Sequence, residues 1–447
     1  MQRDDRDHRT GTEVRGGGRE PQTFTGNMSK GNFCIYKRIE LINEQKLINA
    51  ETQKSLPTTK RGKGIRMNKE VKAQIQEYVD YLLENSSAEK PMWNKEMIRL
   101  GRPNKWNYID GCMITALLAL YEITGEERYF TFAKDFVDFF VQEDGTIKTY
   151  NVKEYNLDNI NTASNLFYLY DKTQDEKYKL ALDHVRTQLD TMPRTAEGSF
   201  WHKDIYPNQV WLDGLYMAEP FYMRYETRFN KMAGCQDVIH QFKNVEKNMR
   251  DPKTGLYYHG YDHSREMYWA DPETGCSPNF WLRSLGWFSL ALVETAQATD
   301  ESLYYEKRYL QKLLEGLVDA LIPFQDESGM FYQVVDRADA KGNYLETSGT
   351  ALISYAILKA VRLEYLAPRY AAMGEKAFNG IANRYLSKNE DGTLKLSGIC
   401  LVAGLGGATH RDGSLEYYFS EPVVENEAKG VAPFLLAYTE MLRREEV

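Results

Sequence analysis

The chain has 447 residues, of which 42% are hydrophobic and 13% aromatic, enough for a large core and a ligand-stacking surface. It carries 56 basic and 64 acidic side chains, a formal net charge of −8, and has no basic block beyond its N-terminal region. This charge pattern argues against nucleic acid as a partner, and the lack of a long apolar stretch argues against a membrane partner.

The cysteine pattern excludes two further classes of protein. The cysteines are odd in number, far apart and never spaced as Cys-x-x-Cys, at Cys34, Cys112, Cys235, Cys276 and Cys400. The sequence therefore predicts neither a disulfide framework nor a zinc site. Because it also shows no phosphate-binding glycine loop and no His/Cys metal spacing, we expect no metal and no cofactor. Reduced thiols in a cytoplasmic protein are the simplest interpretation.

Residues 1–66 are expected to lie outside the folded domain. Their start, MQRDDRDHRTGTEVRGGGRE, is charged and rich in glycine, and it lacks the apolar core of a signal peptide. This composition is typical of a disordered extension, or of a start codon assigned too far upstream, with Met28 and Met67 as alternatives. Because the true start is open, targeting is open too. We place the folded, catalytic domain at residues 67–447.

From about residue 68 the sequence predicts one helix after another. Residues 69–85 have apolar side chains at helical spacing. Residues 110–142 indicate two helices joined around Thr124–Glu127, and residues 158–190 repeat that design. In both units an apolar helix rich in small residues is followed by a short turn and an amphipathic helix. The unit is thus a helical hairpin with one inner-type and one outer-type helix.

Further hairpins follow at residues 209–250, 287–321 and 348–386, and a last apolar helix at 429–444. About six units spaced roughly 50–80 residues apart are too long and irregular for an open solenoid. The pattern predicts an all-α (α/α)6 barrel, a closed double ring of six hairpins. Short β segments are expected in its loops, at GLYYHGYD and GMFYQVVD. The loops and first turns of the inner helices would then meet at one mouth, where we expect the function.

Asp213 is the first candidate catalytic residue, because it lies in the apolar and aromatic stretch QVWLDGLYMAEPF. On a helix, Tyr216 and Met217 share its face. An apolar surrounding favours the protonated form of a carboxyl group, which suits a proton donor near neutral pH. The alternative is a helix N-cap, a common role of aspartate, although no Glu or Gln at position 216 completes a capping box.

Asp158 is the second candidate, at the start of the preceding apolar helix. Asn161, Thr162 and Asn165 lie on its face, and such a polar stripe on an inner helix would suit a wet central cavity. The alternative is again a helix cap.

Two loops and one helix start supply candidate binding residues. His202 and His259 lie in aromatic loops at matching ends of successive hairpins, where imidazoles can donate hydrogen bonds to sugar hydroxyls. Trp281 and Arg283 are expected just before the fourth inner helix, with Trp287 on its first turn. Aromatic faces stack on sugar rings, and arginine pairs with carboxylates through two hydrogen bonds. The alternatives are structural histidines and tryptophans packed in the core.

The stretch NQVWLDGLYMAEPF, together with WLRSLGWFSLALVE and SGTALISYAIL, resembles glycoside hydrolase family 105. These are the unsaturated rhamnogalacturonyl hydrolases, related to the unsaturated glucuronyl hydrolases of family 88. The resemblance extends from about residue 75 to residue 442. It implies an (α/α)6 barrel, in agreement with the hairpin count. It also implies that Asp213 is the general acid/base and that Asp158 is the second active-site aspartate.

The resemblance further implies a substrate and its binding residues. The substrate would be a lyase-generated oligosaccharide with a 4,5-unsaturated uronic acid at its nonreducing end, such as an unsaturated galacturonyl–rhamnose disaccharide from pectin. Asp213 would protonate C4 of the double bond, and water would add at C5. Substrate contacts are expected from His202, Trp211, His259, Trp281, Arg283 and Trp287.

Three alternatives stay open at this point. The first is an unsaturated glucuronyl hydrolase that acts on glycosaminoglycan or ulvan fragments. The second is a sugar epimerase that uses His202 and His259 on opposite faces of a ring. The third is a noncatalytic sugar-binding protein built on the same barrel. The sequence does not identify the second sugar, because loops without readable specificity would bind it.

Overall fold

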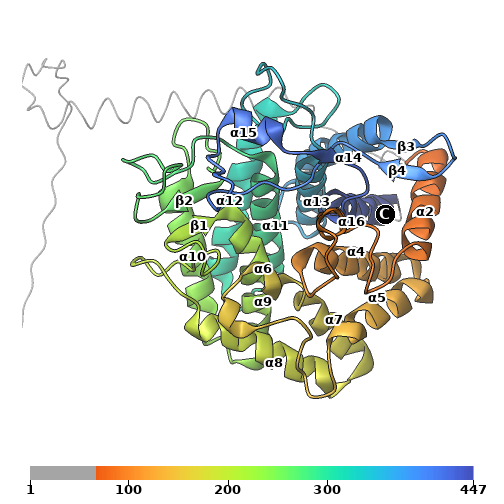
Figure 1. Cartoon of the computed structure of the whole chain (residues 1–447), viewed down its shortest axis with the longest axis horizontal. Helices are drawn as coiled ribbons and strands as arrows, with labels where there is room; N and C mark the ends of the chain where they lie inside the picture. Colours follow the sequence, from red (N-terminus) through yellow and green to blue (C-terminus); the bar gives the residue numbers. More distant parts are fainter. Residues whose placement is uncertain (1–66, 446–447) are drawn as a thin grey trace, which may run out of the picture. The chain divides into compact units, whose positions relative to one another are not determined.

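The computed structural model describes residues 67–445. The expectation of a separate N-terminal extension, residues 1–66, therefore lies outside the described residues. Within the described part the chain is mainly helical (Figure 1). None of these helices combines the length and the apolar character that crossing a membrane requires.

Six buried helical segments form an inner ring. In chain order they are α4 (Tyr108–Thr124), α6 (Asp158–Asn161) continued by α7 (Ser164–Thr173), α9 (Leu212–Phe229), α11 (Leu282–Ala298), α13 (Thr347–Arg362) and α16 (Ala428–Glu445). Each packs against the next, and α16 packs against both α13 and α4, so the ring is closed. The central helices α11 and α13 are buried along nearly their whole length, as the apolar sequences of inner helices require.

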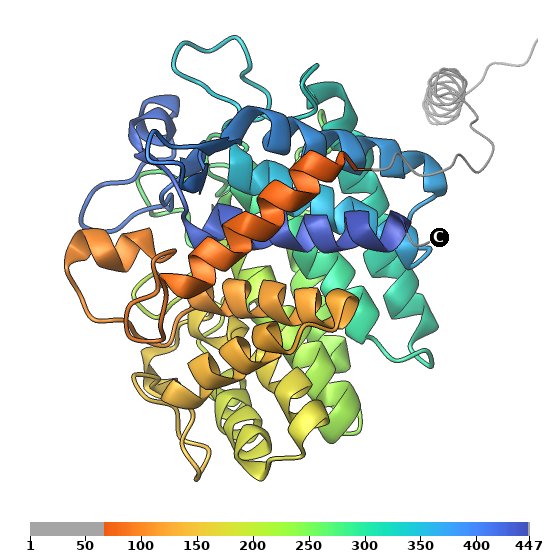
Figure 2. The ribbon, with the colours of Figure 1, turned by 90° about the vertical axis from the view of Figure 1, so that its right-hand side faces the viewer.

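Six amphipathic helices form the outer layer. They are α5 (Glu127–Phe140), α8 (Glu176–Thr191), α10 (Cys235–Met249), α12 (Tyr304–Leu321), α14 (Ala371–Tyr385) and α2 (Lys69–Glu84). The first five each pack on the inner helix that precedes them in the chain. Helix α2 lies across α16, so the two ends of the described chain make the sixth pair (Figure 2). The predicted (α/α)6 barrel is confirmed.

The remaining elements lie in the loops. They are the short helices α3 (Lys95–Leu100) and α15 (Leu415–Ser420) and three two-stranded antiparallel pairs: β1 (Gln209–Trp211) with β2 (Gly260–Asp262), β3 (Leu386–Lys388) with β4 (Leu394–Leu396), and β5 (Ile399–Cys400) with β6 (Val423–Val424). The β segment predicted in GLYYHGYD is confirmed as β2. The stretch GMFYQVVD pairs only through isolated antiparallel bridges, from Val334 to Trp281 and from Tyr332 to Leu345, and does not form a strand.

The second inner helix is interrupted between α6 and α7, where the backbones of neighbouring helices come close. A Cβ atom at Gly111 of α4 would lie 2.8 Å from the Cα atom of Thr162, so only glycine permits this approach. The Thr162 hydroxyl donates to the carbonyl of Asn107. The interruption leaves α6 as a single turn that holds Asp158 at the loop end of the ring.

Candidate active site

Asp213 is the second residue of α9, and it does not cap the helix. The N-cap position belongs to Trp211, and no side chain makes a capping hydrogen bond there. Strand β1 leads into α9, and its pairing with β2 sets Trp211 opposite Gly260. The amide of Leu212 also donates to the carbonyl of His259. The strand pair therefore places His259 beside the first turn of α9.

The His259 imidazole faces the carboxyl group of Asp213. Its Nε2 atom lies 3.4 Å from Asp213 Oδ2, and both atoms are buried without a hydrogen-bond partner in the described part. On the other side of the ring, Nδ1 lies 2.7 Å from the hydroxyl oxygen of Tyr418. When Tyr418 donates this hydrogen bond, Nδ1 accepts it and the proton of the ring lies on Nε2, which faces Asp213. His259 is thus oriented to donate toward Asp213 or a ligand bound beside it.

Tyr418 was not predicted from the sequence, although it is fully buried beside His259. Burial raises the pKa of Tyr418 well above its usual value, and the nearby Tyr417 and Asp213 add to this rise. The phenol therefore keeps its proton. It lies on α15, more than 150 residues away in the chain. No local pattern in the sequence pointed to it.

Asp158 is the first residue of α6, and a different partner sets its charge. Lys203 Nζ lies 2.6 Å from Asp158 Oδ2, and His202 Nε2 lies 3.4 Å from Oδ1. Burial alone would raise the pKa of Asp158, but Lys203 and His202 outweigh burial and lower it. Asp158 is therefore a carboxylate at neutral pH. Lys203 was not predicted, yet its neighbour His202 was, and the bridge between Asn156 and Lys203 holds this loop against α6.

His202 is buried between α9 and the ring of Trp211. The two rings are stacked with centroids 4.4 Å apart. A Cβ atom at Gly214 would lie 3.0 Å from His202 Nδ1, so a glycine there makes room for the imidazole. Burial, opposed by Asp158, lowers the pKa of His202 to about 4. His202 is a neutral imidazole at neutral pH, and its Nδ1 has no partner in the described part.

Trp211 forms the wall behind His202. Its ring also stacks on Tyr206, at 4.9 Å between centroids, and Arg411 donates to the Tyr206 hydroxyl at 2.8 Å. Leu405 packs against the same cluster. Trp211 is only 5% exposed, so it fixes the histidine more than it offers a free stacking surface.

The fourth inner helix starts earlier than expected. Helix α11 begins at Leu282, so Arg283 lies within its first turn and Trp287 in its second, while Trp281 takes the N-cap position. The Trp281 ring lies 4.6 Å from that of His259. Arg283 is 1% exposed and donates from Nη2 to the carbonyl of Cys400. Its Nε and Nη1 atoms are buried without a hydrogen-bond partner in residues 67–445.

Three aromatic side chains from the first two turns of inner helices pack together and are called the aromatic floor here. Trp287 stacks on Tyr216 of α9 at 5.0 Å, and Tyr108 of α4 meets it edge-on at 6.3 Å. Tyr216 lies one turn beyond Asp213. Tyr108 was not predicted as a site residue. It is the first residue of α4, and the first turns of the inner helices were expected to meet at the mouth of the barrel. Tyr108 lies close enough to Asp158 and Asp213 for both to add to the rise in its pKa that burial causes.

The polar stripe predicted after Asp158 has a different role. The Asn165 side chain donates to the carbonyl of Gly111 at 3.0 Å, and that of Asn161 donates to the carbonyl of Tyr216 at 3.5 Å. Thr162 likewise donates to the backbone of α4. The expectation that these residues line a wet cavity is wrong, because their side chains satisfy backbone carbonyls of neighbouring inner helices.

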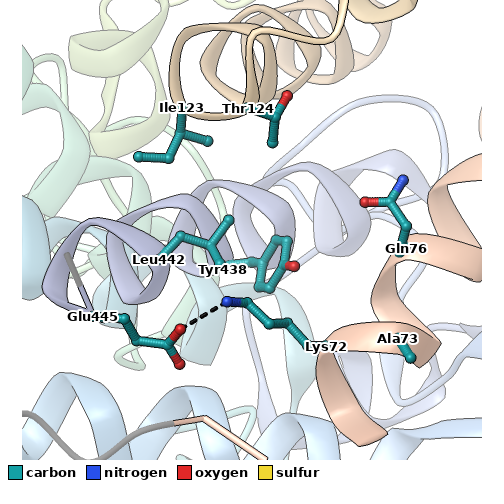
Figure 3. A pocket seen from close by; sticks show the side chains of 8 residues that line it. All are labelled: Lys72, Ala73, Gln76, Ile123, Thr124, Tyr438, Leu442 and Glu445. Carbon is teal, nitrogen blue, oxygen red and sulfur yellow. Dashed lines mark hydrogen bonds and ion pairs between the residues drawn. The ribbon is translucent and has the colours of Figure 1, made fainter. Parts of the chain in front are cut away.

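A hollow lies at the end of the barrel away from the candidate active-site residues (Figure 3). Its volume is about 550 Å³, and it is lined by residues near the start of α2 and the ends of α4 and α16, among them Lys72, Thr124, Tyr438 and Glu445. The first and last residues of α4 are about 24 Å apart at 1.5 Å per residue. None of the predicted site residues lines this hollow, and its Lys72–Glu445 ion pair ties α2 to α16.

Comparison with known proteins agrees with this arrangement. The family model described as Glycosyl Hydrolase Family 88 matches residues 68–445. A solved glycoside hydrolase of family 105 from C. acetobutylicum ATCC 824 is 41% identical and has a TM-score of 0.76, over 84% of this chain and 99% of that chain. The unsaturated rhamnogalacturonyl hydrolase YesR of Bacillus subtilis is 27% identical over 264 residues, 58% of this chain and 72% of that protein.

A more distant neighbour supports the fold alone. The unsaturated glucuronyl hydrolase of Bacillus sp. GL1 is 15% identical, with a TM-score of 0.58 over 83% of this chain and 96% of that chain. The nearly complete overlap with the family model and with the structure from C. acetobutylicum decides the assignment. The chain belongs to glycosyl hydrolase family 88 as that model defines it, and it is a glycoside hydrolase of the family 105 type, as its motifs implied.

Proposed function

We propose that this enzyme removes a 4,5-unsaturated uronic acid from the nonreducing end of oligosaccharides by hydrating the C4–C5 double bond. The observation that carries the proposal is the contrast between two carboxyl groups. Asp158 is held ionised by Lys203 at 2.6 Å, whereas Asp213 faces His259 near the aromatic floor and has no cationic lysine or arginine bound to it in the described part. Two carboxyl groups with different surroundings suit two different tasks.

In this mechanism Asp213 is the general acid and then the general base. Its proton goes to C4, and the C4–C5 π electrons form the new C–H bond. The resulting cation at C5 is stabilised by the ring oxygen. Water adds at C5 and gives its proton to the Asp213 carboxylate. The hemiketal opens by breaking the bond between C5 and the ring oxygen, which gives a ketone at C5 and a hemiacetal at C1. The hemiacetal hydroxyl loses its proton as C1 becomes an aldehyde, and the second sugar leaves from C1 as an alcohol that takes up a proton. Because no displacement occurs at C1, the separation of the two carboxyl groups does not indicate retention or inversion.

The other residues bind and orient the substrate in this proposal. Asp158, as a carboxylate, accepts hydrogen bonds from ring hydroxyls or orients the water. The Nε and Nη1 atoms of Arg283 pair with the uronate carboxylate. Trp281 and Trp287 border the flattened ring. His202 and His259 border the substrate next to Asp158 and Asp213, which their Nε2 atoms face at 3.4 Å. No step uses a metal or cofactor.

For the substrate, we propose an unsaturated galacturonyl–rhamnose disaccharide. Its support is the named activity of YesR, 27% identical to this chain. An unsaturated glucuronyl substrate is the second candidate, since an enzyme with that activity shares the fold. A cytoplasmic location also stays a proposal, in keeping with four buried, free cysteines among the described residues.

A substrate panel tests this proposal. The purified enzyme is given unsaturated galacturonyl–rhamnose, unsaturated glucuronyl disaccharides from glycosaminoglycans, and the saturated counterpart of each, and the released second sugar is measured by chromatography. We expect rhamnose release from the first substrate at the highest kcat/KM and no release from saturated sugars. Preferred release from glucuronyl disaccharides would favour the second candidate. Conversion of saturated sugars alone would favour an epimerase.

A further inference from the structure

A small buried cavity lies behind His202, between the inner helix α9 and the outer helix α10. Its lining includes Phe200, His202, Gly214, Glu219 and Gln241, all of them buried. The volume that the centre of a water molecule can occupy in this cavity is about 10 Å³. One buried water needs about 10–15 Å³ of such space and at least two polar partners. The cavity is therefore the size of a single water site.

Two polar atoms of the lining have no hydrogen-bond partner in the described part of the chain. They are Nδ1 of His202 and Oε2 of Glu219. Gln241, the other polar side chain named above, is already satisfied: its Oε1 accepts from the amide of Phe200 at 2.9 Å, and its Nε2 donates to the carbonyl of Gly198 at 3.1 Å. A buried polar atom without a hydrogen-bond partner costs folding free energy. His202 and Glu219 are therefore the side chains that a bridging water molecule would satisfy.

Glu219 is in a state that can donate a hydrogen bond. It is 1% exposed, and burial together with the nearby Asp237 raises its pKa well above the usual value. Arg194 would lower this pKa, but its guanidinium is held by Asp237 through two hydrogen bonds, at 2.7 and 2.6 Å. This rise favours the protonated carboxylic acid, whose O–H group can donate into the cavity.

We propose that Glu219 is a positioning residue that acts on His202 through one water molecule in this cavity. The Glu219 hydroxyl donates to the water, and the water donates to Nδ1 of His202. A nitrogen that accepts carries no proton, so the single proton of the neutral imidazole stays on Nε2. Nε2 is the atom that lies 3.4 Å from Asp158. The chain of bonds therefore keeps a donor aimed at the active-site carboxylate.

The kinetic test compares Glu219→Gln with Glu219→Leu. The amide of Gln still donates to the water, so kcat should stay within about threefold of wild type. Leu removes the donor, and kcat should fall about tenfold, which is ~1.4 kcal/mol. Val238→Ala, a buried change on the neighbouring helix α10 away from the cavity, controls for loss of stability and should keep the wild-type kcat. Equal losses in Glu219→Gln and Glu219→Leu would overturn the proposal.

A second readout needs no substrate. This is useful because the kinetic test rests on the proposed function. Nitrogen-15 spectra of histidine-labelled protein report the protonation and hydrogen bonding of each ring nitrogen, with His202 assigned through His202→Gln. In wild type and Glu219→Gln we expect Nδ1 to be unprotonated and hydrogen-bonded. In Glu219→Leu it should lose that signature. An unchanged Nδ1 signal in Glu219→Leu would overturn the relay, whether or not the enzyme turns over unsaturated sugars.

Discussion

Asp158 and Asp213 lie in the first turns of successive inner helices, yet their partners differ. Asp158 binds a lysine at 2.6 Å, and Asp213 faces a histidine at 3.4 Å. An adjacent cation favours the ionised form of a carboxyl group. The loop residue Lys203, more than the helix position, therefore sets the charge of Asp158. The same reasoning predicts what removal of Lys203 will do.

Lys203→Met should raise the pKa of Asp158, because burial then acts with less opposition. In a reaction that needs Asp158 as a carboxylate, the enzyme is active above the pKa of Asp158 and loses activity as the pH falls through that pKa. The acidic limb of the kcat–pH profile should thus move to higher pH, by about one unit or more. Lys203→Arg, which keeps the positive charge, should show a smaller displacement. An acidic limb that stays in place in Lys203→Met would show that Lys203 does not control this ionisation.

At the level of elements, glycines set how closely the inner helices pack. A Cβ atom at Gly349 of α13 would lie 2.9 Å from the backbone carbonyl carbon of Leu282 on α11, and one at Gly286 of α11 would lie 2.7 Å from Leu352 Cβ. Both contacts are closer than real side chains allow. The pair α11 and α13 carries Arg283 at its loop end, so this packing also fixes the depth of the arginine.

Gly349→Ala should destabilise the protein by about 1–3 kcal/mol, the usual cost of overpacking a core. The measurement is urea unfolding followed by circular dichroism. Gly316→Ala on the outer helix α12 is the matched control, because a Cβ atom there meets nothing within 4 Å. Alanine in a helix is favoured over glycine, so the control should gain up to about 1 kcal/mol. Equal effects of the two substitutions would contradict the packing argument.

At the scale of the whole molecule, the barrel is closed by its two chain ends. The amide of Met67 donates to Glu445 at 2.8 Å, and the buried hydroxyl of Tyr78 on α2 donates to Asn426 at 2.6 Å, just before α16. These contacts join residues more than 340 positions apart. Closure therefore depends on long-range pairing and is expected to contribute to a cooperative unfolding transition.

Tyr78→Phe should lower the free energy of unfolding by about 1 kcal/mol, the usual contribution of one buried hydrogen bond. The loss is moderate because Asn426 Oδ1 also accepts from the amide of Leu396. Thermal unfolding gives the readout. Tyr305→Phe on α12 serves as the control, since that side chain is 83% exposed and its change should be neutral. A Tyr78→Phe variant as stable as wild type would mean that the hydroxyl does not support closure.

The helical hairpins could be predicted from the sequence because each is a local pattern of 30 to 40 residues, such as α4 with α5. The closing pair α2 and α16 could not, since neither segment indicates its partner. Asp213 and Asp158 stood out through their motif and their place at helix starts. Lys203 and Tyr418 did not, because only the pairing of distant loops brings them to Asp158 and His259.

The central claim is that Asp213 protonates the double bond of an unsaturated uronide. Its most direct test follows the absorbance of the conjugated double bond of unsaturated galacturonyl–rhamnose with wild-type enzyme and with Asp213→Asn. We predict that wild type removes the absorbance in step with rhamnose release. In the variant the rate should fall by about 10² to 10⁴-fold, the usual contribution of general acid–base catalysis. Its thermal stability should be unchanged, since the Asp213 side chain does not cap α9. Rhamnose release with the absorbance intact, or a wild-type rate in Asp213→Asn, would contradict the account.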